Sequence, residues 1–247
     1  MEASSDREPT VKRLGARVRL RRWLLLMAAL ALLAASCDVQ DWAEGGQFRP
    51  WYCSPTDTAI NDGHDGHEGH QHYTEEKGPL NASDCLVLNA FLDDAVAYAS
   101  QFPTAGVAEA NGWHHLAPWI PGQGTHHVNI ERGVSAAFDP RRPNLLMYDS
   151  NNDSGKLTGM VWAVQSGMMP PAGFPGKNDH WHFHETLCFI QRDGGPFIVG
   201  DGISDAQCAS MGGTNQDSSD IWLLHVWLPV YEGWEATDIF NKSHPTI

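Results

Sequence analysis

Three histidines alternate with other residues in the segment NDHWHFHETLC, and this period places His180, His182 and His184 on one face of a β-strand. Imidazole is a common ligand of transition metals, so this face could hold an ion. Residues two apart lie about 6.5–7 Å apart along a strand, so His182 can share an ion with either neighbour. The outer pair lies about 13 Å apart in an ideal strand and cannot easily reach one ion. The strand therefore predicts two ligands, His182 and either His180 or His184.

A metal site needs ligands from other segments as well, because zinc prefers three or four protein ligands. His126 in GTHHVN and His225 in IWLLHVWL are the residues that we expect to complete the site. His127 follows His126 and points to the opposite face of the same strand. The expected cofactor is Zn or Cu.

Two carboxylates beside the histidine strand are candidates for proton transfer if the protein is an enzyme. Glu185 points away from the histidines on a regular strand, and it becomes a ligand only where the strand is bent. In an enzyme the ion would act as a Lewis acid or redox centre, and Glu185 or Asp179 would carry the proton. His114 and His115 follow a predicted helix end, where we expect exposed loop residues.

The first 36 residues are expected to be a signal peptide. Several arginines precede the apolar run WLLLMAALALLAA, which is short for a bilayer span and ends in small residues. The sequence LAASC resembles the bacterial lipobox, in which the cysteine, here Cys37, is lipid-modified and becomes the new N-terminus. An ordinary signal cleaved after Ala35 or Ser36 is the alternative. We therefore expect an exported lipoprotein on the outer face of the bacterial cell membrane.

The mature chain is strongly acidic. Residues 1–36 hold seven of the 16 basic and three of the 30 acidic residues, which leaves a net charge of −18. Such a surface repels nucleic acid and anionic lipid headgroups, whereas it suits cations. We therefore expect a metal ion as partner, membrane contact through the N-terminal lipid, and no nucleic acid. Protein partners are not identifiable from the sequence.

Residues 37–80 are expected to form a flexible, lipid-anchored tether. The segment GHDGHEGHQHYTEEKGP is polar and rich in glycine, without an apolar period, so no packed core is expected. Its histidines could capture Zn or Cu weakly, and a solvated or pH-responsive spacer is the alternative. These histidines are His64, His67, His70 and His72.

Four cysteines remain once Cys37 carries the lipid, and an even number suits an oxidising compartment. They allow three pairings. We expect Cys53–Cys85 and Cys188–Cys208, because each pair closes a local loop. A thiolate metal site is the alternative, but no CxxC spacing supports it.

Residues 81–247 are expected to form one α+β domain that contains the metal site. The segments SDCLVLNAFLDDAVAYASQF, with Ser83 as N-cap, and TAGVAEANG predict two N-terminal helices. DAQCASM could add one helical turn. Later runs rich in β-branched and aromatic residues predict strands: HHVNI, NLLMY, KLTGMVWAV, HWHFHETLCFI, PFIVG and IWLLHVWLPV. We expect the two helices to pack on a mainly antiparallel sheet, which could curl into a barrel.

Part of this domain resembles a family of uncharacterised exported bacterial proteins. The shared pattern runs from GTHHVN through FDPRRPNLLMYD to LHVWLPVYEGWEATDIFNKSHP, over residues 122–245, and it maps onto His126 and His225. The resemblance implies the compartment and the site, but no activity. The histidine strand resembles a cupin metal motif in style only, because too few residues separate His182 from Glu185.

The sequence thus favours an extracytoplasmic, lipid-anchored protein that binds or buffers Zn or Cu. One alternative is a metal-dependent enzyme, an oxidoreductase or a hydrolase, that uses the same ion. Another is a structural module of the envelope whose histidines are satisfied by hydrogen bonds.

Overall fold

A computed structural model of the chain describes residues 70–73, 80–228, 239–240 and 247. Several predictions fall outside these residues: the signal peptide 1–36, the lipidated Cys37, Cys53 and the tether histidines His64 and His67. Among the helices that the structure describes, none is both long and apolar enough to cross a membrane.

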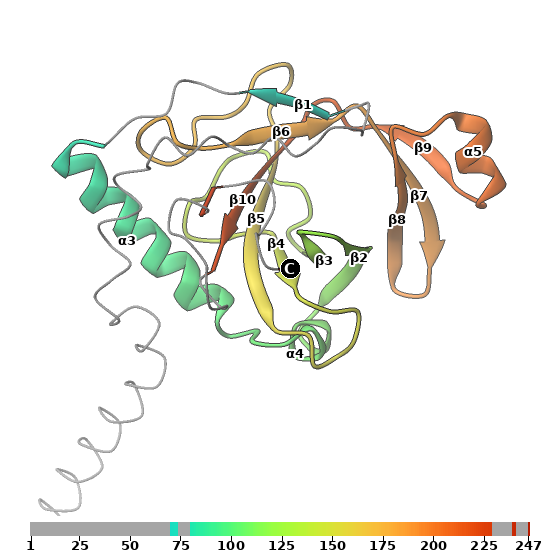
Figure 1. The fold of residues 1–247 in the computed structure, drawn as a ribbon, viewed down its shortest axis with the longest axis horizontal. Coiled ribbons are helices and arrows are strands. Elements are labelled where there is room, and N and C mark those ends of the chain that lie inside the picture. The colour runs from blue at the N-terminus through green and yellow to red at the C-terminus, as the bar shows by residue number, and fades with distance from the viewer. Residues whose placement is uncertain (1–69, 74–79, 229–238, 241–246) are drawn as a thin grey trace, which may run out of the picture. The chain divides into compact units, whose positions relative to one another are not determined.

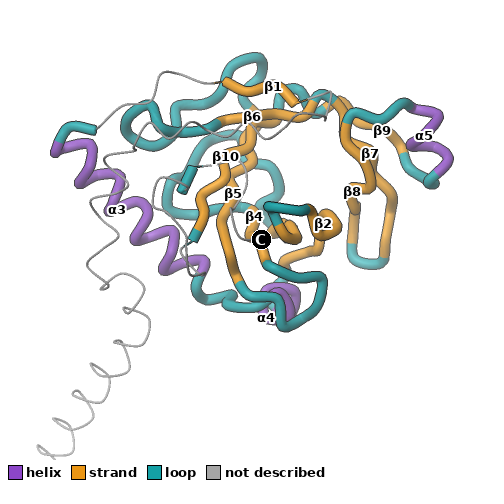
Figure 2. Tube along the Cα trace, in the orientation of Figure 1, coloured by secondary structure: helices purple, strands orange, loops and turns teal. Residues whose placement is uncertain are grey.

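The described residues form two antiparallel sheets and a few helices (Figures 1 and 2). In chain order the elements are β1 (His70–Tyr73), α3 (Ala82–Ala99), α4 (Ala105–Ala110), β2 (Trp113–Ile120), β3 (Gly124–Asn129), β4 (Leu145–Tyr148), β5 (Leu157–Gln165), β6 (Trp181–His184), β7 (Thr186–Arg192), β8 (Gly195–Asp201), α5 (Asp205–Ser210), β9 (Thr214–Asp217) and β10 (Ile221–Trp227). The larger sheet has the order β1-β6-β10-β5-β4-β3-β2, and the smaller has the order β8-β7-β9. Because β1 and β2 are edge strands, the described strands do not close into a barrel.

The mainly antiparallel sheet is confirmed, whereas the rest of the α+β prediction holds only in part. The strand β1 precedes the two helices, so they do not begin the described fold, and it lies within the segment expected to be an unstructured tether. The run expected as one strand, HWHFHETLCFI, is divided at Glu185. Its first part, β6, belongs to the larger sheet, and its second part, β7, belongs to the smaller one.

Helix α3 covers one face of the larger sheet (Figure 1). Its buried apolar residues lie three or four positions apart and form one stripe, which consists of Leu88, Leu92, Ala95 and Ala99. The N-cap is Asn81 and not Ser83, because the Asn81 Oδ1 atom accepts a hydrogen bond of 2.9 Å from the Asp84 amide. We call the side of the sheet that α3 covers the helix face, and the other side the opposite face.

Strand alternation gives the two faces of the larger sheet separate apolar cores. On the helix face α3 packs with sheet residues that include Leu146, Met160, Trp162 and Leu224. The core of the opposite face contains Leu145, Met147, Val161, Ala163 and Trp227. Neighbouring residues of one strand therefore contribute to different cores.

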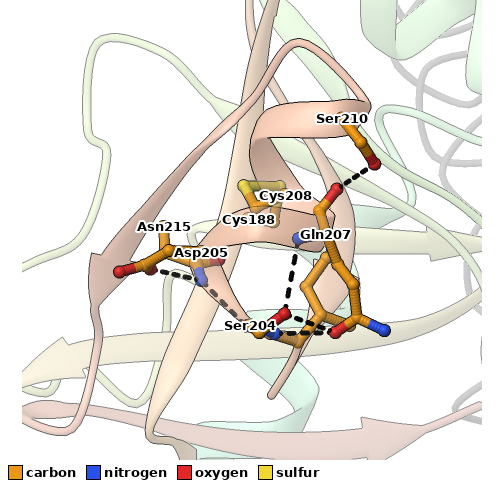
Figure 3. Close-up of a disulfide and its surroundings, with 8 residues drawn as sticks. Cys188, Ser204, Asp205, Gln207, Cys208, Ser210 and Asn215 are labelled. Carbon is orange, nitrogen blue, oxygen red and sulfur yellow. Dashed lines mark hydrogen bonds between the residues drawn. A yellow bond between two sulfur atoms is a disulfide. The ribbon is translucent and has the colours of Figure 1, made fainter.

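The smaller sheet is linked to α5 by the disulfide Cys188–Cys208, as predicted (Figure 3). Both cysteines are fully buried. The short helix α5 begins with a capping box, in which the Gln207 amide donates to Ser204 Oγ and Gln207 Oε1 accepts from the Ser204 amide. Cys85 is also disulfide-bonded, while the predicted pairing with Cys53 remains a prediction.

Candidate metal centres

Two imidazoles lie together on the helix face. Strands β2 and β3 pair with His115 directly opposite His127, and the two rings are stacked with centroids 4.8 Å apart. The rings of Tyr148 and Phe197 contact this pair edge-on and shield it from water. The expectation that His115 lies in an exposed loop was wrong, because β2 begins directly after the turn at Gly112.

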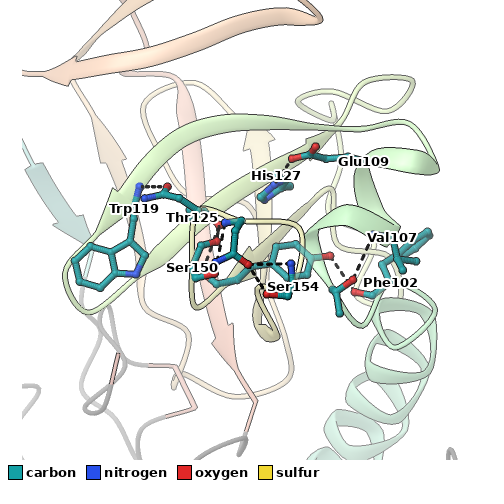
Figure 4. A network of polar contacts seen from close by, with 12 residues as sticks. Phe102, Val107, Glu109, Trp119, Thr125, His127, Ser150 and Ser154 are labelled. Carbon is teal, nitrogen blue, oxygen red and sulfur yellow. Dashed lines mark hydrogen bonds and ion pairs between the residues drawn. The ribbon is translucent and has the colours of Figure 1, made fainter.

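Helix α4 brings a carboxylate to the same place (Figure 4). Thr104 caps the helix, and the Gly106 amide donates to the Asp153 carbonyl at 2.9 Å. A Cβ atom on Gly106 would lie 2.8 Å from Asp153 Cβ, so this close approach requires glycine. The contact fixes α4 so that the exposed Glu109 side chain meets the buried His127, with 3.1 Å between Oε1 and Nε2.

His115 has a lone pair on a buried nitrogen, whereas His127 must move its proton from Nε2 to Nδ1 before it can share an ion with Glu109. A carboxylate accepts, so His127 Nε2 donates to Glu109, and the buried His127 Nδ1 has no hydrogen-bond partner among the described residues. One nitrogen of His115 bonds the Ala117 backbone, and its Nε2 atom is buried without a hydrogen-bond partner among the described residues. Burial lowers the pKa of His127 to about 3 and also lowers the pKa of His115. Both rings are therefore neutral at pH 7, which is the form that binds metal.

These three residues, Glu109, His115 and His127, form the helix-face triad. One ligand atom from each residue lies within 4.8 Å of the other two. Tetrahedral zinc ligands are separated by about 3.3 Å, so the widest pair has to close by up to about 1.5 Å to complete the site. Because an ion lies close to the plane of each imidazole that binds it, one of the stacked rings must also turn. The triad can therefore hold a metal after a local adjustment.

The opposite face gathers four of the five predicted metal ligands. The ring centroids of His126 and His225 are 5.6 Å apart. His225 lies 5.0 Å from His182, which in turn lies 5.5 Å from His184. We call this series, His126–His225–His182–His184, the four-histidine chain. His180, the fifth predicted ligand, is buried just before β6.

Curvature of the larger sheet makes this chain possible. Strands β3 and β10 are separated by β4 and β5 in the sheet order. In a flat sheet they would lie about 14 Å apart, since neighbouring strands are about 4.8 Å apart. The contact between His126 and His225 therefore requires a sheet that curls around the opposite face, although it does not close.

His184, at one end of the four-histidine chain, is bonded by a carboxylate. His184 Nδ1 bonds Asp201 Oδ2 at 2.9 Å, and Asp201 is the last residue of β8 in the smaller sheet. At the other end His126 is buried, and its Nδ1 has no hydrogen-bond partner among the described residues. Burial, reinforced by the nearby imidazole of His225, places the pKa of His126 well below its ordinary value.

The backbone register places β1 along the edge of β6 that does not pair with β10. His70 pairs with His184, and His72 pairs with His182. The end of the histidine-rich segment therefore runs along the strand that carries two members of the four-histidine chain.

The two candidate proton carriers lie apart from these clusters. Glu185 is exposed at the bend between β6 and β7. Asp179 Oδ2 accepts a hydrogen bond of 2.7 Å from the Phe174 amide, and the Trp181 side chain donates to the same carboxyl group. Burial raises the pKa of Asp179 to about 7 against the effect of these two bonds. Phe174 and Trp181 belong to the core of the helix face, whereas His182 points to the opposite face.

Four residues of these clusters were not predicted as site residues: Glu109, His115, His127 and Asp201. His115 had a usable signal, because it lies two residues from Trp113 and Ala117 in an alternating run. Glu109 and Asp201 had none, since the orientation of α4 and the approach of β8 depend on contacts between distant segments.

Comparison with known proteins gave no relative: no family model matches the chain, and no curated protein or solved structure matches it significantly. The resemblance to uncharacterised exported bacterial proteins therefore remains a prediction. The two histidine clusters have to be interpreted from their own geometry.

Proposed function

We propose that this chain is an exported, lipid-anchored protein of the bacterial cell envelope that binds and buffers Zn or Cu. The observation that carries the proposal is the helix-face triad, in which ligand atoms of Glu109, His115 and His127 lie within 4.8 Å of one another. Two neutral imidazoles and a carboxylate are a donor set that zinc accepts, and imidazole also suits copper.

Two further features, the disulfide and the lipobox motif, support the compartment, and the acidic charge supports the capture of cations. The buried disulfide Cys188–Cys208 suits an oxidising environment outside the cytoplasm. The motif LAASC precedes a chain of net charge −18, which attracts cations from dilute solution. A lipid on Cys37 would hold this acidic protein at a membrane surface that would otherwise repel it.

The structure of the triad favours reversible binding. Glu109 is exposed, so water reaches the carboxylate ligand, and one of the stacked rings must turn before both can bind. Sites of this kind exchange their ion more readily than buried sites with all ligands in place, and rapid exchange is what a buffer requires.

A metal-dependent enzyme is the second candidate, and one observation favours it. Three protein ligands leave the fourth position of a tetrahedral ion open to water, on the side where Glu109 meets solvent. An ion at this position could act as a Lewis acid on a substrate. Glu185 and Asp179 do not belong to the triad, so a proton carrier would have to be Glu109 itself or water.

Metal content of the purified full chain tests the proposal. We expect the wild type to bind Zn(II), and His127→Ala to bind one ion fewer by elemental analysis and calorimetric titration. His114→Ala is the matched control, because His114 lies beside the pair and bonds the Pro196 carbonyl outside the triad. Equal zinc content in wild type and His127→Ala would overturn the assignment to the triad.

Fractionation of expressing bacteria tests the compartment. The wild-type chain should remain with the membrane fraction, whereas Cys37→Ser, which removes the lipidation site, should be released or retain its signal peptide. A wild-type protein found in the soluble cytoplasmic fraction would contradict export.

A further inference from the structure

We infer that the four-histidine chain is a second metal site, which holds Cu(II) or Zn(II) through nitrogen ligands alone. It shares no residue with the helix-face triad and lies on the other side of the sheet. The two assignments can therefore fail separately.

Ring separations in the chain match those of imidazoles that share an ion. A Zn–N bond of about 2.0–2.1 Å places the ion about 3.2 Å from the ring centroid, so two tetrahedral ligands have centroids about 5.2 Å apart. The three consecutive separations are 5.6, 5.0 and 5.5 Å. The angles between ring planes are 45°, 80° and 75°, so the planes intersect and an ion can lie near more than one of them.

The contacts also indicate where the ion binds. His182 contacts both His184 and His225, so the ion binds at His182 and either neighbour can share it, while the other joins after a local movement. His126 contacts His225 from β3, and its buried Nδ1 has no hydrogen-bond partner among the described residues. A closer approach of His126 supplies the fourth nitrogen.

The bond between His184 and Asp201 is of the kind that orients metal-binding histidines. In such sites one ring nitrogen donates to a carboxylate, which fixes the tautomer and makes the other nitrogen a better ligand. Here Nδ1 is the bonded nitrogen, so Nε2 is the ligand atom. The Asp201 carboxylate also offsets part of the charge of the ion in a mostly buried site.

The donor set selects the class of ion. Mg²⁺ and Ca²⁺ require oxygen ligands, and the four-histidine chain offers only imidazole nitrogens. Imidazole suits Cu and Zn, and Cu(II) binds nitrogen sites more tightly than Zn(II) does. Trp227 contacts His225 edge-on and belongs to the apolar core of this face, which keeps bulk water away from the ligands.

Titration of the full chain with copper sulfate tests the inference. We expect His225→Ala to bind one Cu(II) fewer than the wild type, and electron paramagnetic resonance should lose one signal with nitrogen coupling. Asp201→Asn should keep the ion count but weaken this site by about 10–100-fold. His127→Ala and the control His114→Ala should leave this signal unchanged.

Asp201→Asn keeps the test decisive if His225→Ala fails to fold, because it conserves the size of a side chain that is partly exposed. Wild-type copper affinity in Asp201→Asn, together with a wild-type nitrogen-coupled signal, would overturn the inference. Loss of copper binding in His127→Ala alone would do the same, since it would assign all bound copper to the triad.

Discussion

His126 and His127 are consecutive residues of β3, yet they belong to clusters on opposite faces of the larger sheet. The cluster of His127 contains a carboxylate and one stacked ring, whereas the cluster of His126 contains three further imidazoles. The difference shows that one strand with a period of two can contribute to two separate sites without any shared side chain.

The two clusters differ in openness as well as in composition. The triad contains the exposed Glu109 and needs a ring to turn, which suits exchange of an ion. The four-histidine chain lies in a curled part of the sheet, with angled rings and nitrogen ligands only, which suits retention. Strand β8 contacts both, because Phe197 packs on His115 and Asp201 bonds His184.

Removal of the disulfide should affect both clusters and give the largest loss of stability. Cys188 and Cys208 are 20 residues apart, so Cys188→Ala with Cys208→Ala should lower the free energy of unfolding by about 3 kcal/mol. Because the smaller sheet carries Phe197 and Asp201, both metal affinities should fall. Urea denaturation and metal titration measure the two effects. Weakening of only one site would show that the clusters depend on different supports.

The residue Asp179 should make stability depend on pH without changing either cluster. Its pKa is raised to about 7, so between about pH 4 and pH 7 the folded protein holds a proton that the unfolded chain has lost. The free energy of unfolding therefore falls as the pH rises through this window. Relative to Asp179→Asn, the wild type should lose about 2 kcal/mol between pH 5 and pH 7.

All histidines are present in both proteins, so the difference in free energy of unfolding between wild type and Asp179→Asn at each pH cancels the contribution of their titration. The side-chain amide oxygen that this substitution introduces can still accept a bond from the Phe174 amide. Parallel stability curves for the two proteins would contradict the raised pKa.

Much of the opposite-face cluster was predictable because it depends on strand period. Alternation alone placed His182 and His184 on one face and separated His126 from His127. The meeting of His126 with His225 across two intervening strands was predicted only as a requirement of a metal site, since curvature of a sheet is set by packing and not by local sequence.

The helix-face cluster was largely missed, because it depends on contacts between distant segments and not on strand period. Glu109 reaches His127 only because α4 is fixed against Asp153 by a contact that needs glycine at position 106. The N-cap shift from Ser83 to Asn81 is a smaller error of the same kind, because both residues have side chains that can cap and sequence alone does not rank them here.

Loss of the α4 cap should give the smallest effect and should distinguish the faces. Thr104→Ala removes the hydroxyl that accepts from the Val107 amide, which should cost about 1 kcal/mol of stability. Since only the triad depends on α4, zinc affinity of the triad should fall while the copper site is unaffected. Ser204→Ala is the matched control, because it removes the cap of α5. An equal loss at both sites in Thr104→Ala would contradict the independence of the two faces.

Native mass spectrometry of the metal-loaded full chain tests the central claim most directly. The four proteins to compare are the wild type, His115→Ala, His225→Ala and the double variant. Independent sites predict that each single variant loses one ion and that the double variant loses two. If either single variant already loses both ions, or if the double variant retains the wild-type count, the claim of two separate metal sites is wrong.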